Sequence, residues 1–138
     1  MTKDPETSPV PSVEAFAAFP RLEFEMLEQL QQMATLRGSD LLERLLVIFR
    51  NQSHEVLTTL GEALRAQDAQ SVAERAHGLK GSARSMGARR LAEIASSIER
   101  SALRGDLDAV EPLLTLLAAE HSASEDAFEA WIRRRTES

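Results

Sequence analysis

The feature that most constrains the fold is a helical spacing of apolar residues that runs from residue 22 to residue 131. Apolar side chains return every three or four residues, which places them on one face of an α-helix with about 3.6 residues per turn. Gly38, Gly87 and Gly105 interrupt the pattern, and glycine tolerates the backbone conformation in which helices often end. Short turns make neighbouring helices antiparallel. We therefore expect an all-α protein, an antiparallel four-helix bundle with an additional short N-terminal helix.

Residues that favour helix ends predict where each helix begins. Asp40 with Glu43, and Ser71 with Glu74, resemble capping boxes, in which two side chains satisfy backbone N–H groups at a helix start. The helices expected in order are one over residues 13–19, one with Pro20 in its first turn and its end near Gly38, one over about residues 40–65, one from between Asp68 and Ser71 to Gly87, one ending at Gly105, and one capped by Asp106 or Asp108.

Length and composition are those of one helical domain. A chain of 138 residues can bury a single core, and five Phe, one Trp and no Tyr indicate that this core is aliphatic. Residues 1–12 hold three prolines and almost nothing apolar, so we expect a flexible tail that cannot offset its ordering entropy. The domain itself is expected over residues 13–135. The initial methionine and the tail favour a free-standing protein over the end of a larger hybrid kinase.

Charge and residue usage exclude several classes of protein. The net charge of −6 argues against nucleic-acid binding, which needs a surplus of Lys and Arg to neutralise phosphates. The chain has no cysteine, which excludes disulfides, thiol catalysis and thiolate metal sites. No apolar run approaches the roughly 20 residues that span a bilayer, and the N-terminus lacks a signal-peptide pattern. We expect a cytoplasmic protein with neither nucleic acid nor membrane as partner.

The stretch from Ala76 to Gly87 combines one histidine with a lysine and several glycines. On a helical wheel its apolar residues lie within about 40° of a common line, and His77 lies roughly 140° away from that line. His77 is therefore expected to face water, with Lys80 one turn away. Gly81 costs a helix roughly 1 kcal/mol relative to alanine. Its presence indicates a need for open space, either for a bulky group or for a partner's active site.

Glu99 is expected to orient this histidine. His77 lies 11 residues before Ala88, in the turn of a helical hairpin, and Glu99 lies 11 residues after it. Equal counts at about 1.5 Å per residue place the two side chains at the same height. A carboxylate that accepts the proton of one ring nitrogen fixes the tautomer and leaves the other nitrogen as a nucleophile. With Lys80 balancing an incoming phosphoryl charge, the pattern predicts phosphorylation on nitrogen.

The run Ala76-His77-Gly78-Leu79-Lys80-Gly81-Ser82 resembles the signature of histidine phosphotransfer domains. Gly87-Ala88 and Leu91 match the turn and helix start that follow the signature in that family. The resemblance covers about residues 22–132. It implies a four-helix bundle that relays phosphoryl groups between aspartates of response-regulator receiver domains.

The resemblance also implies roles for single residues. By it, His77 is the phosphoryl acceptor, Lys80 the electrostatic helper and Gly81 the steric clearance. Family members often carry glutamine where Glu99 stands, and the charge of Glu99 is expected to favour a protonated His77 and to repel a phosphoryl group. The implied reaction is in-line transfer between His77 and a partner aspartate, with Mg²⁺ in the partner receiver domain and no cofactor bound by this chain.

The expected partners are receiver domains, a hybrid histidine kinase, or both. Docking is expected on the surface around His77, including Ala73, Arg84 and Ser85, and an exposed transfer site favours a monomer. The protein would be a carrier and not an enzyme. A kinase is excluded because the sequence has no Gly-rich ATP-binding region and no room for one.

Several alternatives stay open at this point. The chain could be a degenerate bundle that binds receiver or kinase partners as an adaptor without carrying phosphate. Glu99 could be a surface charge or pair with an arginine, and Lys80 could belong to an ordinary solvated face. A metal site is disfavoured, because the three histidines lack close ligand spacing. Of these, His54 is expected at the surface and His121 packed in the core.

Overall fold

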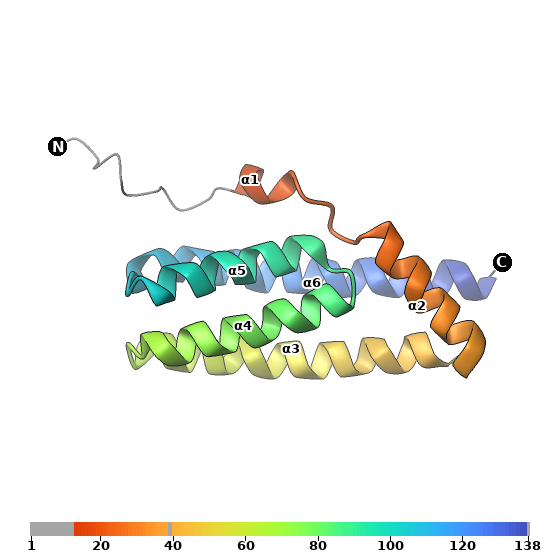
Figure 1. Ribbon diagram of the computed structural model, residues 1–138, viewed down its shortest axis with the longest axis horizontal. Coiled ribbons are helices and arrows are strands. Elements are labelled where there is room, and N and C mark those ends of the chain that lie inside the picture. Colours follow the sequence, from red (N-terminus) through yellow and green to blue (C-terminus); the bar gives the residue numbers. More distant parts are fainter. Residues whose placement is uncertain (1–12, 39, 138) are drawn as a thin grey trace.

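The computed structural model describes residues 13–38 and 40–137, and these residues form helices without any strand. The flexible tail predicted for residues 1–12 lies outside the described residues, and the domain limits of 13–135 stay a prediction. The all-α class is confirmed (Figure 1). The helices are α1 (Val13–Ala17), α2 (Phe24–Arg37), α3 (Leu41–Arg65), α4 (Ala69–Ser85), α5 (Arg89–Leu103) and α6 (Leu107–Glu137).

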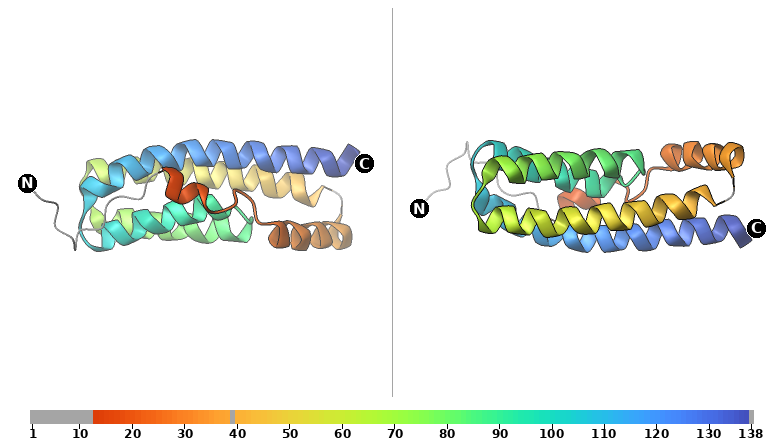
Figure 2. Two further views of the ribbon diagram at one scale, coloured as in Figure 1. Left: turned by 90° about the horizontal axis from the view of Figure 1, so that it is seen from above. Right: turned by 90° about the horizontal axis from the view of Figure 1, so that it is seen from below.

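Helices α3 to α6 form the predicted antiparallel four-helix bundle, and each packs beside the next while α6 closes the bundle against α3. Helices α3 and α6 span 25 and 31 residues, whereas α4 and α5 span only 17 and 15. The longer pair therefore extends beyond the α4–α5 hairpin. Helix α2 lies along this extension, and α1 lies beside α5 (Figure 2).

The core of the bundle is aliphatic, as the composition predicts. All four bundle helices contribute side chains that are fully buried, and each such Leu, Ile or Phe stabilises the fold by about 1.5–3 kcal/mol relative to exposure. The largest of these side chains are Leu60, Leu79, Leu91, Ile98, Leu113, Leu117 and Phe128.

Both predicted capping boxes are wrong. Asp68 caps α4, since its carboxylate accepts hydrogen bonds from the backbone N of Ser71 at 3.1 Å and from Ser71 Oγ at 2.7 Å. These two bonds hold the pKa of Asp68 below its usual value. Asp40 precedes α3 without a side-chain cap and instead pairs with Arg44 at 3.3 Å. A short acidic side chain was available at both helix starts, but only one has the backbone geometry for capping.

The turn between α4 and α5 is held by the segment that precedes α2. Gly87 has φ 73°, a left-handed conformation, and a Cβ at this position would lie 3.0 Å from Met26 Cβ. The carbonyl of Gly87 accepts a hydrogen bond from the N of Glu23 at 2.7 Å, and the N of Arg90 donates to the carbonyl of Pro20 at 3.1 Å. Because residues 20–23 make these contacts, α2 begins at Phe24, and the predicted start at Pro20 is wrong.

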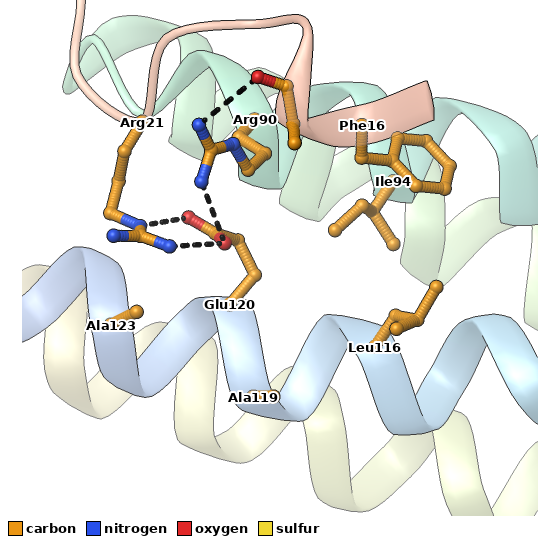
Figure 3. A pocket seen from close by; sticks show the side chains of 9 residues that line it. Phe16, Arg21, Arg90, Ile94, Leu116, Ala119, Glu120 and Ala123 are labelled. Carbon is orange, nitrogen blue, oxygen red and sulfur yellow. Dashed lines mark hydrogen bonds and ion pairs between the residues drawn. The ribbon is translucent and has the colours of Figure 1, made fainter. Parts of the chain in front are cut away.

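A buried carboxylate ties the N-terminal segment to the bundle (Figure 3). Glu120 of α6 accepts hydrogen bonds from Arg21 at 2.8 and 3.3 Å, and the guanidinium of Arg90 lies 4.0 Å away. Arg90 also donates to the carbonyl of Phe19 at 3.0 Å. Beside this network Phe16 of α1 lines a cavity of about 340 Å³ between α1, α5 and α6.

His121 is packed inside the bundle, as predicted, whereas His54 is exposed. The ring of His121 lies 5.6 Å from that of Phe49, and its Nε2 lies 3.1 Å from Oε1 of Glu125. Burial lowers the pKa of His121, and the charge of His54 lowers it further, while Glu125 opposes the shift.

This burial predicts a loss of stability in mild acid. An unfolded histidine has a pKa of about 6.5. Between that value and the lower pKa of folded His121, the unfolded chain binds more protons, so the free energy of unfolding falls as the pH is lowered. We expect the urea midpoint to drop between about pH 7.5 and pH 5.5, and His121→Leu to reduce the drop. The parent protein is the reference, and an equal slope in the parent and in His121→Leu would contradict the assignment.

Candidate functional site

His77 lies on the solvent face of α4, as predicted. Its side chain is 67% exposed, whereas Val72, Ala76 and Leu79 on the opposite face of the helix are buried in the core. The amphipathic spacing of α4 therefore explains the position of the histidine, because packing the apolar residues turns His77 outward.

Glu99 of α5 contacts the histidine across the hairpin. Its Oε2 lies 2.8 Å from Nδ1 of His77, and its side chain is 16% exposed. The residue count about the turn predicted that the two side chains lie at one height, and this contact confirms it. An ionised carboxylate has no proton to donate and can only accept a hydrogen bond. The proton of this bond therefore resides on Nδ1. In neutral His77 the lone pair is then on Nε2.

Lys80 binds the other oxygen of the same carboxylate. Its Nζ donates to Oε1 of Glu99 at 2.6 Å, and its side chain is 17% exposed. The prediction from the sequence was that Lys80 faces an incoming phosphoryl group, and this ion pair was not predicted. One signal was present: the helical wheel places both Lys80 and Glu99 at the edge of an apolar seam. In a hairpin these edges meet.

The charges at this site compensate one another. Burial raises the pKa of Glu99, but hydrogen bonds from Lys80 and His77, together with their charges, outweigh burial and lower it. Glu99 is therefore ionised at neutral pH. The ammonium of Lys80 balances this charge, so His77 lies beside a carboxylate that is already paired.

Two residues of α4 close to His77, Gly78 and Gly81, are glycines without a side chain. A Cβ built at Gly78 or Gly81 would meet no atom within 4 Å, so neither glycine is required by packing inside the protein. The clearance predicted at Gly81 is thus present. Gly78, for which no role was predicted from the sequence, extends the same open surface.

The three predicted docking residues differ in accessibility. Arg84 and Ser85 are exposed, and Ser85 Oγ donates to the carbonyl of Ser82 at 2.8 Å. Ala73 is only 5% exposed and belongs to the core, so it offers a partner almost no surface. Ala73 lies at the flank of the apolar seam of α4, and packing of the bundle covers that flank at its position.

The described residues offer neither a metal-binding cluster nor a membrane-spanning helix. Among the described residues, no three His, Asp or Glu side chains lie close enough together to hold a metal ion. None of the described helices combines the length and the apolar character that crossing a membrane requires.

Comparison with known proteins agrees with this geometry. The family model for the Hpt domain matches residues 44–127, which contain His77, Lys80 and Glu99. The aerobic respiration control sensor protein ArcB is 27% identical over 135 residues in both Escherichia coli K12 and Shigella flexneri. That alignment covers 98% of this chain but 17% of ArcB, so the chain spans only a small part of this relative's length.

A solved structure shares the architecture. The crystal structure of histidine-containing phosphotransfer protein B (HptB) from Pseudomonas aeruginosa PAO1 superimposes with a TM-score of 0.74 at 30% sequence identity. The match covers 83% of this chain and 96% of HptB. Together with the family match, it shows that this chain belongs to the Hpt domain family, whose members are phosphotransfer carriers in two-component phosphorelays.

Proposed function

We propose that this protein carries a phosphoryl group on Nε2 of His77, accepts it from the aspartate of one receiver domain and passes it to that of another. The observation that carries the proposal is the hydrogen bond between His77 and Glu99, with Nδ1 and Oε2 2.8 Å apart on an otherwise exposed imidazole. It occupies one ring nitrogen and leaves the other free to react.

The proposed step conserves atoms and charge. The Nε2 lone pair attacks the phosphorus of the aspartyl phosphate as the bond from phosphorus to the aspartate oxygen breaks, and the aspartate leaves as a carboxylate. The ring becomes positively charged, and the proton stays on Nδ1, where it remains hydrogen-bonded to Glu99. Mg²⁺ is expected in the partner receiver domain, where it stabilises the phosphoryl oxygens. Transfer to a second receiver reverses these bond changes.

We assign Lys80 a role through Glu99. A carboxylate beside the phosphoryl group repels it, by roughly 2–3 kcal/mol for unit charges about 6–8 Å apart at an effective dielectric constant of 20. The 2.6 Å ion pair from Lys80 cancels most of this charge. A glutamine in place of Glu99, common in the family that the signature resembles, would hold His77 without needing such a cation. With Lys80 neutralising its charge, Glu99 can orient His77 as the amide of a glutamine would.

The exposed position of the histidine fits a carrier that meets its partners in turn. His77 lies on a convex helix surface with open space over Gly78 and Gly81, so a partner has access to Nε2 without any movement of the bundle. The competing function is an adaptor that binds the same partners without carrying phosphate. Phosphoryl transfer distinguishes the two.

The first test follows labelled phosphate. The protein is mixed with receiver domains that have been phosphorylated on aspartate with labelled acetyl phosphate. Label should move to the protein, survive alkali, be lost in acid and be absent from His77→Gln. His54→Gln, which alters another exposed histidine, should accept label like the parent. Label on His77→Gln would contradict the assignment, and binding of a receiver to both proteins without transfer would support the adaptor.

A double-mutant cycle tests the role of Lys80. Lys80→Met leaves the carboxylate of Glu99 unbalanced and should slow transfer roughly 10- to 100-fold, the equivalent of about 1.4–2.8 kcal/mol. Glu99→Gln should stay close to the parent, because the amide oxygen still accepts the Nδ1 proton. In the double variant transfer should return close to the rate of Glu99→Gln. If Lys80→Met is equally slow with either residue at position 99, Lys80 acts on the phosphoryl group directly.

Gly81 should trade stability against transfer. Gly81→Ala and Gly81→Gln both place a side chain in open space and improve helix propensity, so the free energy of unfolding should rise by about 0.5–1 kcal/mol. Transfer should fall with the size of the new side chain, and we expect more than about a tenfold loss for Gln. The measurements are urea denaturation and single-turnover transfer. A Gln variant as fast as the parent would show that the clearance is not needed.

A further inference from the structure

Charge is unevenly distributed over the protein. Helices α4 and α5, with Arg104 directly after them, contain seven Lys or Arg and three Glu, a net charge of +4, whereas the whole chain has −6. The remainder of the chain is therefore at −10. The hairpin that bears His77 is the basic region of an acidic protein.

Three of the seven cations are balanced inside the structure. Lys80 pairs with Glu99, Arg89 pairs with Glu93 at 3.0 Å and with Glu23 at 3.6 Å, and the guanidinium of Arg90 approaches Glu120 to within 4.0 Å. The other four make no ion pair with a carboxylate in the described part of the chain: Arg75, Arg84, Arg100 and Arg104.

Three of these four unbalanced arginines lie around the histidine. Arg84 follows His77 by seven residues, about two helical turns, so both share the exposed face of α4. Arg100 directly follows Glu99 on α5, and Arg104 lies one turn farther along. We call Arg84, Arg100 and Arg104 the basic rim. Arg75 lies about 200° around α4 from His77 and is not part of it.

Serine hydroxyls, not carboxylates, hold two arginines of the rim. Arg100 donates to Ser96 Oγ at 2.8 Å and to Ser97 Oγ at 3.1 Å, and Arg104 donates to Ser101 Oγ at 3.5 Å. A hydroxyl can restrict the position of a guanidinium without neutralising it. The charge is therefore kept available to solvent. The one acidic side chain on the same face of α4, Glu74, is engaged with Gln70 Nε2 at 3.2 Å.

We propose that the basic rim attracts and orients an acidic protein surface, namely the cation-binding carboxylate cluster of a receiver domain, over His77. The proposal rests on the proposed function for the identity of this partner. Carboxylates are the ligands with which proteins hold Mg²⁺, so a surface that binds Mg²⁺ beside its aspartate is acidic. The rim attracts such a surface while the acidic remainder of the chain repels it, which selects the productive face during diffusion.

Steering of this kind acts on the association rate and depends on ionic strength. Complementary charge can raise association rates by 10- to 1,000-fold at low salt. The Debye length shortens from about 10 Å at 0.1 M salt to about 3 Å at 1 M, which removes the attraction. Direct contacts between docked surfaces instead affect mainly the dissociation rate, and this difference makes the rim testable.

The experiment reverses charge at matched positions. Arg84→Glu/Arg100→Glu is compared with Arg37→Glu/Arg65→Glu. All four arginines lie in the last turn of their helices, so both variants change the net charge and the helix-end electrostatics alike. Stopped-flow measures association with purified receiver domains, treated with Mg²⁺ and beryllofluoride to mimic the aspartyl phosphate, at 50 mM and 500 mM NaCl. Thermal denaturation checks that each variant is folded.

We expect the rim variant to associate at least about tenfold more slowly than the parent at 50 mM NaCl and the control variant to stay within about threefold. At 500 mM the three rates should converge. Equal loss in both variants would show that only net charge matters and would overturn the rim. A loss confined to the dissociation rate, a failure of every receiver to bind, or binding of DNA at the rim in place of receivers would also overturn it.

Association is also measured in the His77→Gln background, and phosphoryl transfer is measured separately in the parent. The two results together separate this proposal from the proposed function. Salt-dependent association that the rim variant loses, without phosphoryl transfer in the parent, would support the rim and contradict the carrier. Phosphoryl transfer with equal association of rim and control variants would support the carrier and contradict the rim.

Discussion

The register between α4 and α5 is the constraint on which the site depends. His77 and Glu99 are 22 residues apart in sequence, and their 2.8 Å contact exists only because the hairpin turns at Gly87 in a left-handed conformation. The carbonyl of Gly87 is bonded to the N of Glu23, and Met26 packs where a Cβ would lie. The segment before α2 thus fixes the end of the hairpin, and the two bundle helices carry that register over about three turns to the histidine.

Glu99 gives the site its particular chemistry. It holds Nδ1 of His77 and, in the proposed reaction, carries a charge that repels the phosphoryl group. Lys80 offsets that charge at 2.6 Å, so the three side chains form one electrostatic unit that spans two helices. Such units respond to mutation as a whole, because removing one member leaves the charge of another exposed to the reaction. The lysine of the signature is therefore understood best together with the residue at position 99.

The network that stabilises the fold and the proposed recognition surface use different charged residues. The buried Glu120 is surrounded by Arg21, Arg90 and Ser124, and this network joins the N-terminal segment to α5 and α6. The arginines of the basic rim pair with no carboxylate of the described residues, and serines hold two of them, Arg100 and Arg104. Compensation inside the molecule and exposure beside the histidine are what a carrier needs if it has to stay folded while it meets charged partners in turn.

The sequence by itself determined the helices, the aliphatic core and the outward direction of His77, because these follow from the spacing of apolar residues along a local period. A residue count about the turn was enough to bring Glu99 to the histidine. Tertiary structure decided the cap at Asp68, the start of α2 at Phe24, the burial of Ala73 and the ion pair between Lys80 and Glu99. The last three depend on which neighbouring segment covers a given side chain or backbone group, and no local period carries that information. The cap at Asp68 is a contact between residues three apart that the backbone conformation at this helix start decides.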